Sequence, residues 1–125
     1  MDLSDKSYMV KHGPSGGLRA SKEGKGRYDL ISSPAMRRLA LWYEEGARIH
    51  GDRNWEMGIS ISGCISSILR HTFKYLAGSH DEDHLAAVAW NAFAIMHFEE
   101  RPTIYDGHTF DLPWQAPESG AKSVR

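Results

Sequence analysis

The segment from Asp81 to Glu100 constrains the fold more than any other part of the chain. It predicts one helix, because neither glycine nor proline occurs in it and Pro102 stops it. Apolar side chains cover most sides of this helix: Leu85, Ala86, Ala87, Val88, Ala89, Ala92, Phe93 and Met96. A helix that is apolar on most sides must be covered by neighbours, so we expect it at the centre of an all-α bundle.

Two polar side chains interrupt this apolar surface. Asn91 follows His84 by one heptad, so both lie on one face of the helix. Asp81, Glu82 and Asp83 stand at the end where the helix dipole favours acids. Capping accounts for one or two of these acids but not for the histidine and the amide on the buried stripe. The pattern therefore indicates a polar site inside the helical core.

Two further helices are predicted before this one. The first begins at Ser33-Pro34 and ends at Gly51, and the second begins after Ser60 or Ser62 and ends at Gly78. Three helices, one of them apolar nearly all round, do not close a bundle easily in so short a chain. We therefore expect a homo-oligomer, a dimer or a tetramer, that completes the packing across subunits.

Composition divides the chain into three parts. Residues 1–26 are rich in glycine, serine and lysine and have no apolar period, so a flexible N-terminal segment is expected. Residues 27–101 form the helical domain. Residues 102–125 form an irregular C-terminal arm, which carries too many apolar side chains for a pure tail: Tyr105, Phe110, Leu112 and Trp114.

Charge and cysteine content exclude several classes of protein. The net charge of −1 is not that of a protein that binds nucleic-acid polymers through charge. Cys64 is the only cysteine, which excludes an internal disulfide and a cysteine-based zinc site and favours a cytoplasmic setting. Residues 1–13 lack the apolar run of a signal peptide, so none is expected, and the longest apolar run, Leu85–Met96, is too short to span a bilayer. No membrane partner is expected.

Basic and aromatic residues in two glycine-bounded segments are candidates for ligand binding. Asn54 and Trp55 combine an amide and an aromatic ring, which suits a nucleobase, or else Trp55 fills the core from a turn. Lys25 and Arg27 either meet phosphate oxygens or belong to a solvated tail. Arg70 either takes a phosphate or points to solvent.

Three other polar residues have two readings each. Glu44 and Glu45 in the first helix either pair with Arg48 or serve as metal ligands. His71 either belongs to a site or is a core histidine with an ordinary hydrogen bond.

Four segments together suggest a family: Gly24–Ile31, Gly46–Gly58, Arg70-His71 and Asp81–Asn91. In order and spacing, over about residues 22–100, they resemble the phage-type dATP/dGTP diphosphohydrolases, small members of the all-α, MazG-like NTP pyrophosphohydrolase superfamily. The resemblance implies an all-α oligomer that uses Mg²⁺ or Mn²⁺ to hydrolyse a purine dNTP to dNMP and pyrophosphate, in the host cytoplasm if phage-encoded. The chain departs from the superfamily where Arg48 follows Glu44-Glu45 and where His84 and Asn91 replace acids.

Such a reaction requires a cation that neutralises phosphate charge and activates water, which assigns roles to the candidates. The expected metal ligands are Asp81, Glu82, Asp83, His84, Glu44 and Glu45. The expected catalytic residues are His71, His84 and Asp83. The expected substrate-binding residues are Lys25, Arg27, Asn54, Trp55, Arg70 and Asn91.

Two alternatives remain open. One is an HD-type metal phosphohydrolase, in which the His80-Asp81 doublet joins His50 or His71 upstream and Asp106 or Asp111 downstream. The other is a helical nucleotide-binding or interaction protein without turnover, which the incomplete set of carboxylates would suit.

Overall fold

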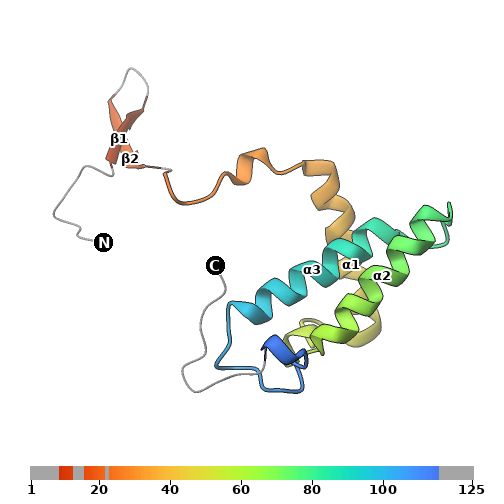
Figure 1. Ribbon diagram of the computed structural model, residues 1–125. Coiled ribbons are helices and arrows are strands. Elements are labelled where there is room, and N and C mark those ends of the chain that lie inside the picture. The colour runs from red at the N-terminus through yellow and green to blue at the C-terminus, as the bar shows by residue number, and fades with distance from the viewer. Residues whose placement is uncertain (1–8, 13–15, 22, 116–125) are drawn as a thin grey trace. The chain divides into compact units, whose positions relative to one another are not determined.

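The computed structural model describes residues 9–12, 16–21 and 23–115 (Figure 1). The chain forms two compact units, residues 1–32 and 33–125. Parts of the predicted flexible segment, residues 1–8, 13–15 and 22, lie outside the described residues, as does the end of the predicted arm, residues 116–125.

The smaller unit contains a short antiparallel hairpin that the sequence did not predict. Strand β1 (Met9–His12) pairs with β2 (Gly17–Ala20). A 3-10 helix, η2 (Tyr28–Leu30), follows. Next to it the Arg27 guanidinium donates to both oxygens of Asp29, at 2.9 and 2.8 Å. Among the described residues, Arg27 is therefore already engaged by a carboxylate.

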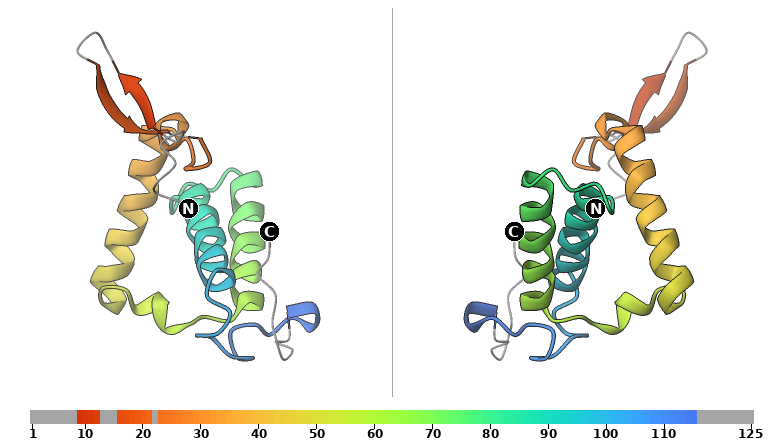
Figure 2. Two further views of the ribbon diagram at one scale, coloured as in Figure 1. Left: turned by 90° about the vertical axis from the view of Figure 1, so that its left-hand side faces the viewer. Right: turned by 90° about the vertical axis from the view of Figure 1, so that its right-hand side faces the viewer.

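The larger unit is a bundle of three helices, as predicted: α1 (Ser33–His50), α2 (Ile61–Leu76) and α3 (His84–Glu99). Helices α2 and α3 are antiparallel neighbours, and α1 also packs against α3 (Figure 2). The antiparallel α2–α3 pair brings the end of α2 to the start of α3. Polar residues from these two ends form the candidate site.

Side-chain caps set the starts of α2 and α3. Ser60 accepts a hydrogen bond from the Gly63 N–H at 3.2 Å, and Asp83 accepts one from the Ala86 N–H at 3.1 Å. The expected start of the third helix at Asp81 was wrong, because Asp83 is the N-cap and α3 begins at His84. Asp81 and Glu82 therefore lie in the turn before the helix.

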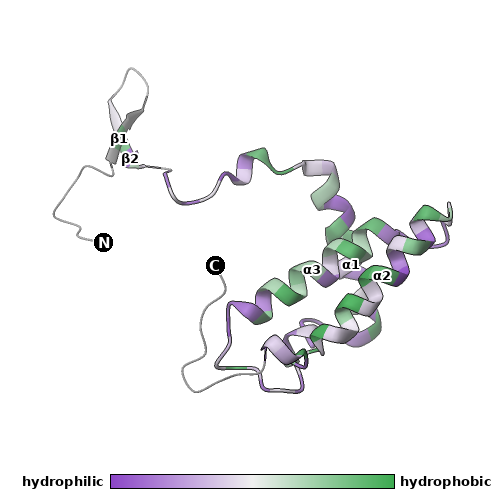
Figure 3. Ribbon diagram, viewed as in Figure 1, coloured by the Kyte–Doolittle hydropathy of each residue, from purple (hydrophilic) through white to green (hydrophobic). Residues whose placement is uncertain are grey.

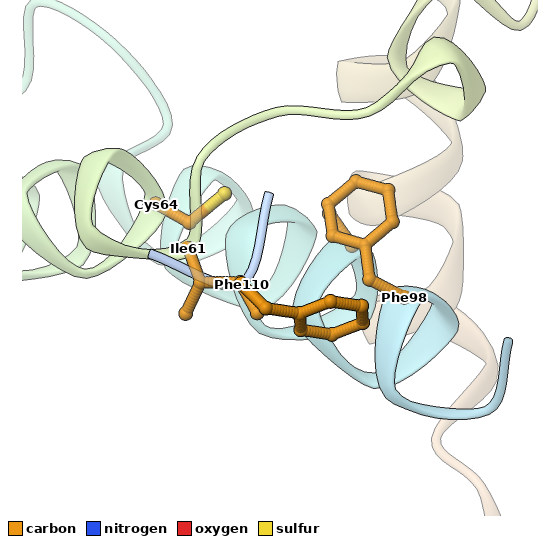
Figure 4. Packing of buried hydrophobic residues seen from close by; sticks show 5 residues of the cluster. Ile61, Cys64, Phe98 and Phe110 are labelled. Carbon is orange, nitrogen blue, oxygen red and sulfur yellow. The ribbon is translucent and has the colours of Figure 1, made fainter. Parts of the chain in front are cut away.

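The C-terminal arm completes the core. Phe110 packs with Ile61, Cys64, Ala94 and Phe98, which come from α2 and α3 (Figure 4). Backbone and side-chain bonds hold the arm to the bundle, since Thr109 O accepts from Ile61 N and Tyr105 Oη donates to Glu56 O.

A glycine makes room for this arm. Gly58 has a φ of 107°, and a Cβ built there would lie 2.8 Å from Thr109 Oγ1. Any other residue at this position would be strained and would push the arm away.

Hydrophobic positions recur along α2 and α3 (Figure 3), and on both helices several of these side chains are exposed among the described residues. The exposed members are Ile65, Leu69, Phe73 and Leu76 on α2 and Leu85, Phe93 and Met96 on α3. They recur at helical spacing, so each set forms one ridge. We call these seven residues the exposed apolar face.

Within the part of the chain that the structure describes, none of the helices has the length and hydrophobicity needed to cross a bilayer.

Candidate functional site

Two buried histidines meet where α2 ends and α3 begins. His71 is 4% exposed and His84 is 2% exposed, and their Nδ1 atoms lie 2.9 Å apart. His71 faces the core because it shares the buried stripe of α2 with Ile61 and Cys64. His84 is the first residue of α3, so its side chain points back over the preceding turn, toward the acids.

Asp81 determines which nitrogen of His84 carries a proton. Its Oδ1 lies 2.7 Å from His84 Nε2 and also accepts from Ser79 Oγ at 2.7 Å. The hydrogen bond from Ser79, and then that from His84, lowers the pKa of Asp81 to about 2. An ionised carboxylate only accepts, so the His84 Nε2 is protonated and, in the neutral ring, Nδ1 presents a lone pair to His71.

Asp83 has a different set of partners. Arg38 of α1 donates to both its oxygens, at 2.8 and 2.6 Å, while Oδ1 also caps α3. The guanidinium, more than any other group, lowers the pKa of Asp83. Both oxygens are thus engaged, and Asp83 joins α1 to α3.

The surroundings of His71 keep it neutral. Trp42 and the imidazole form a T-shaped contact, with ring centroids 6.0 Å apart. Burial is the main cause that lowers the pKa of His71, and Arg70 contributes. A neutral imidazole can donate a lone pair, which a protonated one cannot.

Asn91 lies on the same buried stripe of α3 as His84, as the heptad spacing predicted. It is 7% exposed, and its Nδ2 donates to Ala87 O, one turn back, at 2.8 Å. The described hydrogen bond of this amide is thus to its own helix.

One group of side chains in the described residues has donor atoms close enough to hold a metal ion. It consists of His71, Glu82 and His84, whose ligand atoms all lie within 4.8 Å of one another. Glu82 is exposed, whereas both histidines are buried. Two imidazole nitrogens and one carboxylate are chemically suitable for a divalent cation.

A pocket of about 500 Å³ opens between α1, α3 and the loop that follows α1. Tyr43, Trp55 and Trp90 form its aromatic wall, and Tyr43 lies 6.1 and 6.0 Å from the two indoles. Asn54, in the 3-10 helix η3 (Asn54–Met57), lines it with Arg53. A pocket of this size with aromatic walls and a few polar groups is typical of small-molecule sites.

The pocket and the histidine pair share two helices. Trp90 follows His84 by six residues, which is about 9 Å of helix rise. On α1 the neighbouring residues Trp42 and Tyr43 contact His71 and line the pocket, respectively. Six residues also turn an α-helix by about 240°, so Trp90 and His84 lie on different faces of α3.

The structure shows the predicted packing of Trp55 against the core, while its contact with a nucleobase stays a prediction. Trp55 lines the pocket and also packs against the core cluster, with its ring 4.7 Å from His97 and 6.5 Å from Phe98. Its position is therefore fixed by packing before any ligand arrives.

Other predicted site residues are exposed or belong to the smaller unit. Glu45 pairs with Arg48 at 2.5 Å on the exposed side of α1, and Glu44 is exposed beside it. Arg70 is also exposed. Lys25 and Arg27 belong to the smaller unit. The roles proposed for these residues stay predictions.

The acids that an HD-type site would need have other partners. Asp106 accepts from the His108 N–H at 2.9 Å, and Asp111 accepts from the Ser62 N–H at 3.0 Å. Ser62 opens α2, about 13 Å of helix rise from His71. The geometry gives the HD-type reading no support.

Sequence reasoning missed four residues around the site: Arg38, Trp42, Tyr43 and Trp90. The sequence analysis assigned no role to any of them. Two signals were available. Trp42 and Tyr43 are adjacent on α1, and two adjacent aromatic residues of a helix cannot both face one core. On α3, Trp90 stands beside the buried Asn91.

One of three comparisons with known proteins found a match. Searches of curated proteins and of solved structures found no match. A family model described as "dATP/dGTP diphosphohydrolase, N-terminal" matches residues 15–108, which include all three helices and every residue of the pocket and the histidine pair. The chain therefore belongs to the dATP/dGTP diphosphohydrolase family.

Proposed function

We propose that this protein hydrolyses a purine deoxynucleoside triphosphate to the monophosphate and pyrophosphate, with Mg²⁺ or Mn²⁺ as cofactor. The observation that carries the proposal is the aromatic pocket beside the histidine pair in a chain of this family. The base would lie between the rings that line the pocket, and the phosphates would extend along α3 toward Glu82.

The residues around the histidine pair fit a divalent cation. Glu82 contributes an exposed carboxylate, and His71 and His84 contribute nitrogen donors within reach of it. When bound, the cation would neutralise phosphate charge and lower the pKa of a water molecule. The neighbouring Asp81 would hold His84 in place through its 2.7 Å bond.

Pocket residues account for base binding. Trp55 and Trp90 offer ring faces or edges, and Asn54 offers a donor and an acceptor for the base or the sugar. Because core packing already holds Trp55, binding a nucleotide in the pocket would cost little entropy for ordering this side chain.

The exposed apolar face supports a homo-oligomer. Phe73 is 66% exposed and Leu76 is 73% exposed, values that large apolar side chains rarely show together on a helix ridge in a monomer. We propose that a second copy of the chain covers this face and forms a four-helix arrangement from two α2–α3 pairs.

The test of the activity is incubation with each of the common dNTPs and NTPs and either cation, with products separated by ion exchange. Monophosphate and pyrophosphate that disappear on adding EDTA are expected, with purine deoxynucleotides turned over fastest. Intact nucleotides with both cations would refute the activity and leave a nucleotide-binding protein.

Two tryptophan variants test the pocket. Trp55→Ala should raise KM for the nucleotide about tenfold, because loss of stacking on one base costs about 1–3 kcal/mol. Trp114→Ala is the matched control, since Trp114 is 79% exposed and does not line the pocket. Equal KM values in the two variants would remove Trp55 from the binding site.

A further inference from the structure

His71 and His84 are in direct contact through their ring nitrogens. The two buried imidazoles direct the same nitrogen, Nδ1, at each other, with centroids 5.2 Å apart and planes tilted by 43°. An exposed carboxylate, Glu82, lies within 4.8 Å of both.

We propose that His71, His84 and Glu82 form a binding site for a nitrogen-preferring divalent metal of the series from Mn²⁺ to Zn²⁺, with Asp81 as the positioning residue. The use of this metal in turnover rests on the proposed function, whereas its binding does not. Mg²⁺ prefers an all-oxygen shell, so of the two cations named in the proposed function Mn²⁺ is the one that suits two imidazoles.

The spacing of the two nitrogens fits a shared ion. Ligand nitrogens lie about 2.1 Å from such metals, so a pair at right angles is about 3.0 Å apart and a tetrahedral pair about 3.4 Å apart. The observed Nδ1–Nδ1 distance is 2.9 Å. The distance between the two nitrogens would therefore change by about half an ångström, and each ring would also turn so that its lone pair points at the ion and not at the other nitrogen. The exposed Glu82 side chain would close the site from the solvent side.

Asp81 supplies the second observation that points to a metal. Its carboxylate accepts the Nε2–H of His84, which leaves the Nδ1 lone pair facing inward. A carboxylate that holds the outer nitrogen of a histidine whose inner nitrogen binds metal is the usual support of such ligands. Ser79 and Lys74 hold Asp81 in turn, by a 2.7 Å hydrogen bond and a 3.6 Å ion pair.

His71 must exchange one proton when the metal binds. Without metal, His71 Nδ1–H donates to the lone pair of His84 Nδ1. With metal, the proton moves to His71 Nε2, so both rings stay neutral and both Nδ1 atoms carry lone pairs. No net proton is released from the pair.

The experiment is titration of the metal-stripped full chain with Co²⁺ as a spectroscopic probe, followed by competition with Mn²⁺, Zn²⁺ and Mg²⁺. One Co²⁺ per chain is expected, with visible absorption bands typical of nitrogen ligation, and Mg²⁺ should compete weakly. His71→Asn should abolish saturable binding, with circular dichroism checking the helices. Absence of saturable binding to the wild type would overturn the proposal.

Asp81→Asn gives a test that does not disturb the core, because Asp81 is exposed. It should weaken Co²⁺ binding about 10–100-fold, since the amide no longer fixes the His84 tautomer. Asp106→Asn is the matched control, because Asp106 makes a similar carboxylate–histidine contact with the exposed His108. Equal Co²⁺ affinity in the two variants would remove the positioning role of Asp81.

Nitrogen-15 NMR of the metal-free protein reads the tautomers directly. An unprotonated Nδ1 in His84 is expected in the wild type and not in Asp81→Asn. The site and the activity can fail separately. Co²⁺ binding without nucleotide turnover would refute the proposed function alone, and nucleotide turnover without saturable Co²⁺ binding to the wild type would refute this site alone.

Discussion

Asp83 binds Arg38 of α1 and caps α3. Substitutions can separate the contributions of these two contacts to the stability of the fold. Asp83→Asn keeps a good N-cap for α3 but loses the charge that Arg38 binds. Asp83→Ala loses both. The order of stability should therefore be wild type, then Asp83→Asn, then Asp83→Ala.

The magnitudes follow from geometry and exposure. Two charge-assisted bonds to Arg38 are short, but the two side chains are 55% and 32% exposed, so solvent screening reduces the pair to about 1 kcal/mol. An N-cap contributes about 1 kcal/mol. We therefore expect unfolding free energies to fall by about 1 kcal/mol in Asp83→Asn and about 2 kcal/mol in Asp83→Ala.

The assay is urea unfolding followed by circular dichroism at one protein concentration. Arg38→Gln should cost about as much as Asp83→Asn, and the double variant should cost little more than either. Glu44→Gln, an exposed change on α1, is the control and should alter stability by less than about 0.5 kcal/mol. Equal stability of Asp83→Asn and Asp83→Ala would refute the capping role, and additive losses in the double variant would refute the ion pair.

Two further predictions concern the arm and the exposed apolar face. Ser62 lowers the pKa of Asp111 through its hydroxyl and its N–H, so this bond stabilises the fold above the ordinary carboxyl pKa and is lost as the pH falls below it. Asp111→Asn should thus be less stable than the wild type near about pH 6, and the difference in urea midpoint should shrink toward about pH 3; a constant difference would contradict this. Phe73→Glu should convert the proposed oligomer to monomers in analytical ultracentrifugation, whereas the exposed change Glu44→Gln should not, and an unchanged mass in Phe73→Glu would exclude the apolar face as the interface.

Local signals in the sequence were enough to predict the three helices. Ser60, Pro102 and the glycines at 51 and 78 mark ends that the structure places within a few residues. The third helix started later than expected because three consecutive acids all suit a first turn, and only the backbone shows which of them is the cap.

Heptad spacing also placed His84 and Asn91 correctly on one buried stripe. It did not reveal that His84 would face His71, because that contact joins two helices whose rotation depends on core packing. For the same reason the spacing gave no reason to pair Arg38 with Asp83, which are 45 residues apart. The hairpin at Met9–Ala20 was missed because its strands are too short to show an alternating pattern.

The contacts between the C-terminal arm and the start of α2 also predict the order in which parts of the domain fold. Its bonds, Tyr105 to Glu56 and Asp111 to Ser62, each span 49 residues, while α2 and α3 are joined by a short turn. Closing a long loop costs more entropy than pairing adjacent helices, so the arm should dock after the α2–α3 pair has formed. Substitutions in the arm should then speed unfolding and leave the folding rate nearly unchanged. We therefore expect unfolding to begin with release of the arm from the bundle.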